Sequence, residues 1–354
     1  MAVSGPVLDP ALVALGADAR VEAWVASWPA AASDRPLGRV VRLDVEASVV
    51  GTANGAVRAR VRGNIRKGGG IVAGDWVRLD GAEELSIEAL APRWTWIARR
   101  DPRGLTQVLA ANVDLVFVAA PADRMSLSRV EREVAIAWDG GATPVVLLTK
   151  ADLDDSGAHE QLRERLVGVD VHPVSSLRGD GVDLVRALLQ PSRTAVLLGP
   201  SGAGKSTLVN ALLGYDAAAT GIVRERDHRG RHVTTSREIH LVPTGGVLVD
   251  TPGLRSLSLA PDHGGVAAAF PDIEDLAADC RFADCGHSNE PGCAVRAAVE
   301  AGELDAARFA NYLALRSDLE VEVRRDDPAA AREARTAARV EQRATKKFKK
   351  DRGH

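Results

Sequence analysis

The sequence lacks the features that would place it in a membrane or an oxidising compartment. No apolar run approaches the roughly 18 residues that a transmembrane helix needs. The N-terminal segment has no basic region followed by an apolar block, as a secretory signal would. The three cysteines all lie between Cys280 and Cys293, which excludes an extended disulfide framework. We therefore expect a cytoplasmic protein that does not associate with membranes.

Aromatic residues and net charge are also sparse. Aromatic side chains make up 4% of the chain, so stacking on nucleic-acid bases is not the favoured mode of binding. The formal net charge is -3, and only local charged patches can therefore indicate a polyanionic partner. The hydrophobic content of 45% over 354 residues is enough for two or three domains with buried cores.

Two hydrophobic periodicities divide the chain. From residue 37 to about residue 97, short β-like runs alternate with glycine-rich turns, which predicts a small all-β barrel. After about residue 112, strands and amphipathic helices alternate, which predicts a parallel sheet with covering helices. The expected units are an N-terminal extension (1–34), the barrel (35–103), an α/β domain (104–262), a helical domain around the cysteines (263–326) and a basic tail (327–354).

A phosphate-binding loop is predicted within TAVLLGPSGAGKSTLVNALL, which is a hydrophobic strand, a glycine loop and a helix. The loop satisfies G-x-x-x-x-G-K-[ST], whose backbone N–H groups surround the β-phosphate of a nucleotide. Lys205 would neutralise the β- and γ-phosphates, and the Ser206 hydroxyl would bind Mg²⁺. The predicted phosphate-binding residues are Gly199, Pro200, Ser201, Gly202, Ala203, Gly204, Lys205, Ser206 and Thr207.

Two later segments are predicted to respond to the γ-phosphate. In LVDTPGLRS, Asp250 ends a short apolar strand and can hold Mg²⁺ through water, and the Gly253 amide could contact the γ-phosphate. The polar segment 214–238 contains a threonine that could close over Mg²⁺, with Thr235 as the first choice and Thr234 as the second. The alternative for this segment is a plain exposed loop, although loops of this length are usually functional or disordered.

A guanine-recognition site is predicted before the phosphate loop. PVVLLTKAD ends a strand with Thr149, Lys150 and Asp152, and the carboxylate can accept both N1–H and N2–H of guanine while the lysine stem covers the ring. Adenine lacks this pair of donors and would leave the carboxylate unpaired. The next strand ends in a serine turn, VSSLRGDG, where Ser175 and Ser176 begin a segment that could offer a backbone amide to guanine O6.

The order of these motifs is unusual, because most GTPases place the base motif after the phosphate loop. A parallel sheet tolerates the change if the original termini are joined and the chain is opened elsewhere. The opening would fall just after D-T-P-G, so that this segment leads directly into the C-terminal domain. We expect the nucleotide state to be transmitted there.

A metal site is predicted from C-x4-C-x-H-x5-C, formed by Cys280, Cys285, His287 and Cys293. Three thiolates and one imidazole suit tetrahedral zinc, and four protein ligands are typical of a structural rather than a catalytic site. We expect one zinc ion that stabilises a small helical domain. The alternative is three buried free cysteines beside an unrelated histidine.

The motifs TKAD, VSS, GPSGAGKST, GRHVTTS, DTPG and CRFADCGHSNEPGC, in that order, resemble the ribosome small-subunit-dependent GTPase A family over about residues 35–320. The resemblance implies an OB-fold, a circularly permuted GTPase domain and a zinc domain. It also implies GTP hydrolysis stimulated by the small ribosomal subunit during its late maturation, with the subunit, its rRNA and GTP or GDP as partners. We expect a monomer.

One departure from the family is Thr149, where asparagine is usual. It mainly weakens a contact that braces the loop, and Lys150 and Asp152 keep the base site intact. Leu254 follows D-T-P-G and cannot orient water as the glutamine of Ras-like enzymes does, so intrinsic hydrolysis should be slow. The resemblance points instead to His232, with Lys205 and Thr235 completing the catalytic set. A solvent-facing loop histidine is the alternative.

RNA contacts are predicted on the barrel. Within RARVRGNIRKGGG, the strand period of two puts Arg58, Arg60 and Arg62 on one face, and Arg66 and Lys67 follow in a glycine loop. Such an edge could bind the RNA backbone. The alternative to RNA binding for these arginines is a solvated strand face. For the basic tail (327–354), the alternative to RNA binding is a solvated helix end.

The sequence is compatible with three functions. The first is a ribosome-assembly GTPase, and the second is a GTP-gated RNA-binding switch with negligible turnover, which Leu254 makes conceivable. Turnover measured with and without small subunits separates them. The third is phosphate transfer from ATP, against which the TKAD motif and the serine turn argue.

Overall fold

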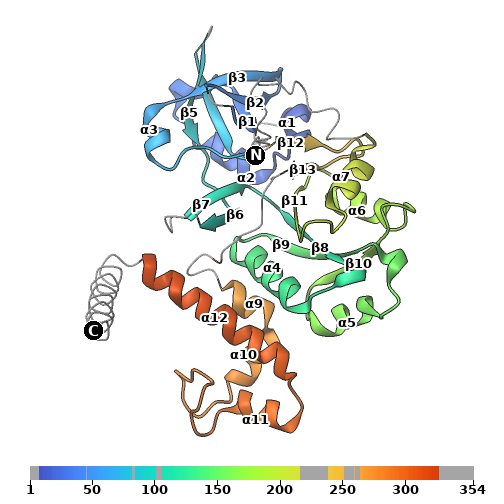
Figure 1. Ribbon diagram of the computed structural model, residues 1–354. Helices are drawn as coiled ribbons and strands as arrows, with labels where there is room; N and C mark the ends of the chain where they lie inside the picture. The colour runs from blue at the N-terminus through green and yellow to red at the C-terminus, as the bar shows by residue number, and fades with distance from the viewer. Residues whose placement is uncertain are drawn as a thin grey trace, which may run out of the picture.

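The computed structural model describes residues 8–44, 46–81, 84–100, 106–215, 238–250, 259 and 264–326. Within these ranges a β-barrel, a mostly parallel sheet with helices on both faces, and a helical C-terminal unit follow one another, from top to bottom in Figure 1. None of the helices in these ranges is both long and apolar enough to cross a membrane.

Part of the described N-terminal extension is helical. Asp9 and Asp18 accept backbone N–H groups and so cap the first two helices. Val21 and Trp76, both with no exposed surface, belong to an apolar cluster that joins this extension to the barrel. The elements are α1 (Pro10–Ala14), α2 (Ala19–Ala26) and the 3-10 helix η1 (Ala30–Ala32).

Five strands close the predicted barrel. Their order is β1-β2-β3-β5-β4, and pairing between β1 and β4 completes the ring. The pairing of β3 with β5 is parallel and the others are antiparallel, which is the strand arrangement of an OB-fold. The strands are β1 (Leu37–Arg42), β2 (Ser48–Thr52), β3 (Gly55–Val61), β4 (Trp76–Asp80) and β5 (Leu85–Leu90).

The segment after β3 corrects one prediction. Arg66 and Lys67 lie in the last turn of a short helix, α3 (Gly63–Lys67), and not in a glycine loop. Arg62 is the residue that precedes this helix, so it lies just beyond the end of β3. The buried side chain of Ile65 packs into the barrel core and supplies the tertiary contact that favours helix here.

Beyond the barrel, β6 (Trp96–Arg100) and β7 (Thr106–Ala111) form a separate antiparallel pair. The main sheet then runs in the order β10-β9-β8-β11-β13-β12, in which β12 alone is antiparallel to its neighbour β13. Its strands are β8 (Leu115–Pro121), β9 (Thr143–Thr149), β10 (Asp170–Val174), β11 (Thr194–Leu198), β12 (Glu238–Leu241) and β13 (Val247–Asp250).

Helices cover both faces of this sheet, which explains its nearly continuous apolar strands. Alternate residues of β8 and β9 pack into two separate cores, one shared with α4 and α5 and the other with α6 and α7. The prediction of alternating strands and helices is confirmed. The helices are α4 (Leu127–Asp139), α5 (Ala158–Arg165), α6 (Val182–Leu189) and α7 (Lys205–Leu213).

The barrel and the α/β unit share one continuous sheet, because β12 also pairs with β1 at Arg42 and Glu238. The fully buried side chain of Arg39 reinforces this junction. It donates hydrogen bonds to the Asn112 carbonyl at 2.9 Å and the Thr194 hydroxyl at 2.8 Å. Burial lowers the pKa of Arg39 to about 10, so the guanidinium stays charged at neutral pH.

The C-terminal unit consists of α9 (Gly265–Ala269), α10 (Pro271–Ala277), α11 (Ala294–Ala301) and α12 (Ala306–Asp326). It packs on α4 through a shared apolar core that includes Phe270 and Tyr312. The carboxylate of Glu131, on α4, has no exposed surface and accepts hydrogen bonds from Arg165 and Arg308, each at 2.7 Å. This buried charge network joins α4 and α5 to α12.

Candidate functional site

The phosphate loop lies between β11 and α7, as predicted. Gly199 has φ 133°, and a Cβ there would come within 2.6 Å of the Ala119 carbonyl on β8, so only glycine fits. Gly204 precedes α7 with φ 83°. The N-terminus of this nine-residue helix offers backbone N–H groups and the positive end of its dipole, a suitable site for a phosphate.

Side chains hold the backbone carbonyls of this loop. Lys205 Nζ donates to the carbonyls of Gly199 and Pro200, both at 2.7 Å. Thr149 Oγ1, at the end of β9, donates to the Ala203 carbonyl at 2.6 Å. Thr149, at the position where the family usually has asparagine, therefore still forms a hydrogen bond to the loop. These bonds fix the orientation of three peptide carbonyls of the loop.

The predicted base residues meet at one edge of the sheet. β9 and β10 are parallel, with Thr149 opposite Val174, so the serine turn begins beside the TKAD motif. Lys150 adopts the left-handed conformation, φ 54°, at the start of the 3-10 helix η3 (Ala151–Leu153). A hydrogen bond from the buried Ser175 hydroxyl lowers the pKa of Asp152, so this carboxylate is ionised at neutral pH. Ser176 follows and is half-buried.

The structure adds two residues to this site that sequence reasoning did not identify. Asp123 and Arg124 lie in the 3-10 helix η2 (Ala122–Arg124), directly after β8. The hydrogen bond from Lys150 Nζ to Asp123, at 2.8 Å, lowers the pKa of the Asp123 carboxyl. Arg124 donates to the Ser201 carbonyl at 2.6 Å. Their position at the carboxyl end of a buried central strand was the available signal.

A pocket of about 210 Å³ adjoins the start of the phosphate loop, between the end of β8 and α4. Glu133 and Pro200 are among its lining residues. Burial raises the pKa of Glu133, although its carboxylate accepts a hydrogen bond from Arg129 at 3.1 Å. The pocket therefore contains a carboxyl group that protonates more readily than an exposed one.

Several predicted residues lie outside the described ranges, namely His232, Thr234, Thr235, Gly253 and Leu254. Asp250 is the last residue of β13, which runs parallel to β11. The backbone of Asp250 therefore ends at the same edge of the sheet as the phosphate loop. Ser206 and Thr207 lie exposed in the first turn of α7.

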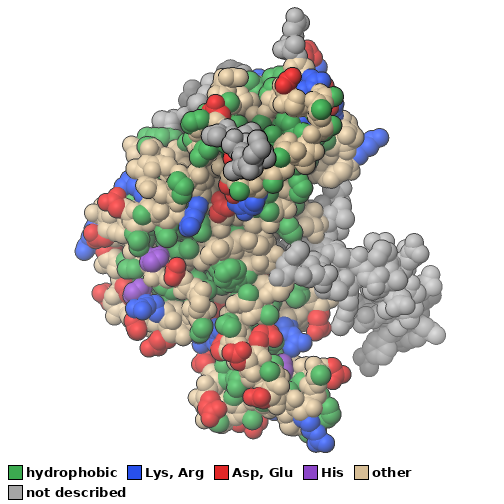
Figure 2. All heavy atoms as spheres, turned by 180° about the vertical axis from the view of Figure 1, so that it is seen from behind, with side chains coloured by type: hydrophobic (Ala, Val, Ile, Leu, Met, Phe, Trp, Pro, Cys, Tyr) green, Lys and Arg blue, Asp and Glu red, His purple; other side chains and the backbone are tan. Residues whose placement is uncertain are grey.

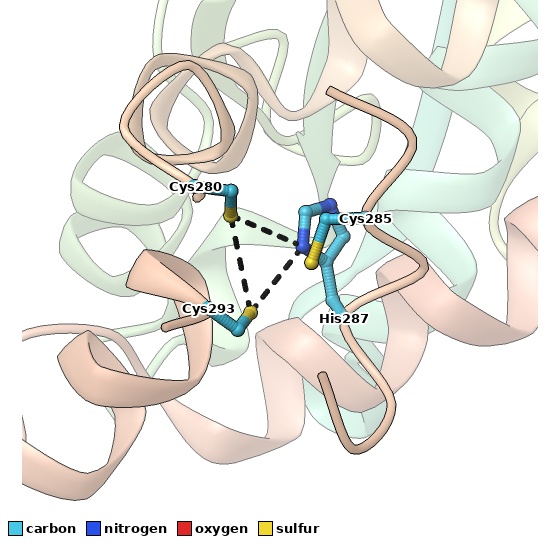
Figure 3. Close-up of side chains that lie close together, drawn as sticks. All are labelled: Cys280, Cys285, His287 and Cys293. Atoms are coloured by element: carbon cyan, nitrogen blue, oxygen red, sulfur yellow. Dashed lines mark hydrogen bonds between the residues drawn. The ribbon is translucent and has the colours of Figure 1, made fainter. Parts of the chain in front are cut away.

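The four predicted metal ligands converge in the C-terminal unit (Figure 3). Their ligand atoms all lie within 4.8 Å of one another. His287 Nδ1 is 3.7 Å from Cys280 Sγ and 3.5 Å from Cys293 Sγ. Desolvation raises the pKa of the Cys285 thiol to about 11, so the thiolate of this residue would form with the cation bound. The spacing and the donor set fit a tetrahedral zinc ion.

The loop that carries these ligands is shaped by Glu290. Its carboxylate accepts hydrogen bonds from the backbone N–H groups of Gly286, Ser288 and Asn289, at 3.1, 2.8 and 3.0 Å. These bonds turn the backbone around His287, which has φ 58°. The sequence pattern predicted the four ligands but not this carboxylate.

The arginines of the barrel are separate from both sites and have acidic partners. Arg58 is 4.0 Å from Asp44 and Arg60 is 3.1 Å from Glu84, while 62% and 67% of the two arginine side chains remain exposed. Arg62 donates a hydrogen bond to Ser86 at 3.1 Å. On the face seen in Figure 2, acidic and basic side chains are interspersed and form no large patch of one sign.

The fold and the site define a P-loop nucleotide-binding protein in which the base-site strands precede the phosphate-site strand. A sequence profile of the family RsgA GTPase matches residues 90–260. The chain is 41% identical over 331 residues to the small ribosomal subunit biogenesis GTPase RsgA of Streptomyces coelicolor, covering 88% of this chain and 89% of that protein. The chain therefore belongs to the RsgA GTPase family.

A second relative and two solved structures are also similar to this chain. RsgA 1 of Listeria monocytogenes is 39% identical over 274 residues, which cover 77% of this chain and 79% of the relative. The crystal structure of YjeQ from Thermotoga maritima has a TM-score of 0.61 at 24% identity and covers 80% of this chain and 98% of that one. YloQ, described as a circularly permuted GTPase, has a TM-score of 0.60 at 23% identity, and the match covers 83% of this chain and 98% of that one. The fold and the permuted order predicted from the motifs are confirmed.

Proposed function

We propose that this chain hydrolyses GTP and acts in the maturation of the small ribosomal subunit. The observation that carries the proposal is the joining of a phosphate loop and a TKAD base motif by the Thr149–Ala203 hydrogen bond, in a member of the RsgA family. Relatives in that family are named for biogenesis of the small subunit. The corresponding partners are the small subunit with its rRNA, and the protein acts as a cytoplasmic monomer.

Guanine is the base that this site would select. Asp152, ionised and hydrogen-bonded by Ser175, offers a carboxylate to the N1–H and N2–H of guanine. Lys150 would cover the ring, and the turn at Ser175 and Ser176 would supply an amide to O6. An adenine would leave the carboxylate without donors, which costs binding energy.

Mg²⁺ would accompany the nucleotide, held by Ser206 and Thr235 and, through water, by Asp250. When bound, it would neutralise charge on the phosphates. The N–H groups of residues 199–207 and the Lys205 ammonium would bind the β- and γ-phosphates, with the Gly253 amide as a further contact. His232 would orient the attacking water, because Leu254 has no group that can do so.

One zinc ion is proposed at Cys280, Cys285, His287 and Cys293, where the convergence of four donors supports a structural site. The domain boundaries proposed above (1–34, 35–103, 104–262, 263–326 and 327–354) put this site in a unit of its own. We further propose that Arg58, Arg60, Arg62, Arg66 and Lys67 contact the rRNA backbone. The exposure of Arg58 and Arg60 supports an exchange of their carboxylate partners for phosphates.

Nucleotide competition and subunit binding test this function. Unlabelled GTP should displace a fluorescent GTP analogue, whereas ATP at the same concentration should not. The protein should sediment with small subunits in the presence of a non-hydrolysable GTP analogue, and less so with GDP. Equal displacement by ATP would contradict the base site, and sedimentation with large subunits only would contradict the partner.

A further inference from the structure

The Ser201–Gly202 peptide of the phosphate loop is contacted by an arginine from the end of another strand. Arg124 Nη2 lies 2.6 Å from the Ser201 carbonyl oxygen. A methyl group built on Gly202, which has φ 72°, would come within 2.5 Å of the same nitrogen. The guanidinium therefore lies across this peptide and contacts both of its residues.

This contact fixes which way the peptide faces. In a trans peptide the carbonyl and the following N–H point in opposite directions. With the Ser201 carbonyl held by the guanidinium, the Gly202 N–H therefore points away from Arg124, and the inference below puts the phosphates on that side. A charged donor on the carbonyl also polarises the peptide and strengthens the hydrogen bond that its N–H can donate.

Arg124 is itself held in place by the base site. Its neighbour Asp123 pairs with Lys150 at 2.8 Å, so η2 is anchored between the TKAD motif and the phosphate loop. Arg124 also forms part of the wall of the pocket of about 210 Å³ described above. Arg129 and Glu133 line the same pocket and pair with each other at 3.1 Å. The Glu133 carboxylate therefore has a partner other than Arg124, whose guanidinium contacts the loop.

We infer that Arg124 is a positioning residue for GTP hydrolysis, which acts by orienting the Gly202 N–H toward the phosphates. The inference rests on the proposed function, because it needs GTP at the phosphate loop. Negative charge shifts on the transferring and leaving phosphates during phosphoryl transfer. An oriented N–H donor is therefore worth more in the transition state than in the bound ground state. Arg124 should affect turnover more than affinity.

Kinetics of Arg124→Ala and Arg124→Lys test this inference. In Arg124→Ala, kcat should fall about tenfold, the lower end for a charged hydrogen bond because the side chain is exposed. The Kd for GTP should change less than about threefold. Arg124→Lys should retain part of the rate, because lysine keeps the charge without the planar fork. Arg99→Ala, at a surface arginine that contacts Gln107, is the matched control and should behave as wild type.

Chemical rescue separates positioning from a structural defect. Removing the side chain enlarges the pocket beside the loop, so guanidinium ion at millimolar, non-denaturing concentration should restore part of kcat in Arg124→Ala and have no effect in Arg99→Ala. A wild-type kcat in Arg124→Ala overturns the inference alone. So does an equal loss of kcat and GTP affinity that guanidinium does not restore. A wild-type protein that turns over no GTP, with or without small subunits, overturns the proposed function and the inference with it.

Discussion

Replacing Glu131 with glutamine should loosen the junction between the nucleotide-binding unit and the C-terminal unit. The buried carboxylate accepts hydrogen bonds from Arg165 and Arg308 at 2.7 Å and from Asn311 at 2.5 Å. An amide of the same size keeps one acceptor oxygen, but it removes the negative charge between two guanidiniums and turns an NH₂ group toward one of the three donors.

The free energy lost in Glu131→Gln depends on the carboxylate partners that the two arginines keep. Breaking a buried ion pair costs about 3–5 kcal/mol. Arg308 keeps its partner Asp272, and Arg165 keeps Asp305 at 2.7 Å, so neither guanidinium is left without a carboxylate. We therefore expect a loss near the lower limit, about 3 kcal/mol.

Hydrogen exchange of α12 amides measures this loss locally. A junction weakened by about 3 kcal/mol should raise the exchange rate of protected α12 amides by about a hundredfold. The control is Glu300→Gln, which removes the surface pair of Arg296 and Glu300 at 3.7 Å and should change the free energy by less than about 0.5 kcal/mol. Equal protection of α12 in Glu131→Gln and wild type would refute the role assigned to this network.

Three further variants test the sites. Asp152→Asn should exchange guanine for xanthine specificity, since an amide donates where the carboxylate accepted, and an unchanged preference for GTP in a competition assay would contradict the base site. Metal analysis of Cys285→Ser should show less than the expected zinc content of about one ion per chain, with nucleotide binding largely intact; full zinc retention would refute the ligand set. His232→Ala should lose about a hundredfold in subunit-stimulated kcat at near-normal GTP affinity, and undiminished stimulation would assign the water to another group.

The parts of the site that were predictable from the sequence are those built from local segments. The phosphate loop needs only a strand, glycines and a helix that are adjacent in the chain, and Gly199 and Gly204 adopt the positive φ values that such a loop requires. The metal ligands also lie within 14 consecutive positions. The parallel pairing of β9 with β10 then brings Ser175 to Asp152.

The parts that were not predictable depend on contacts between distant residues. Arg124 is 77 positions from Ser201, and Arg308 is 177 positions from Glu131, so neither pairing leaves a periodic signal. The helix α3 was taken for a loop because five residues are too few for helical periodicity, and the burial of Ile65 against the barrel decides the conformation. Strand β6 pairs with β7 rather than with a strand of the barrel.

A comparison of hydrolysis rates shows whether GTP turnover by this protein is linked to the small ribosomal subunit. The initial rate of GTP hydrolysis should be measured with small subunits, with large subunits and with neither, alongside Lys205→Ala as the control that removes the ammonium proposed to bind the phosphates. We expect slow hydrolysis by the protein alone, strong stimulation by small subunits, little by large subunits and none in Lys205→Ala. A rate that small subunits do not raise would contradict this link.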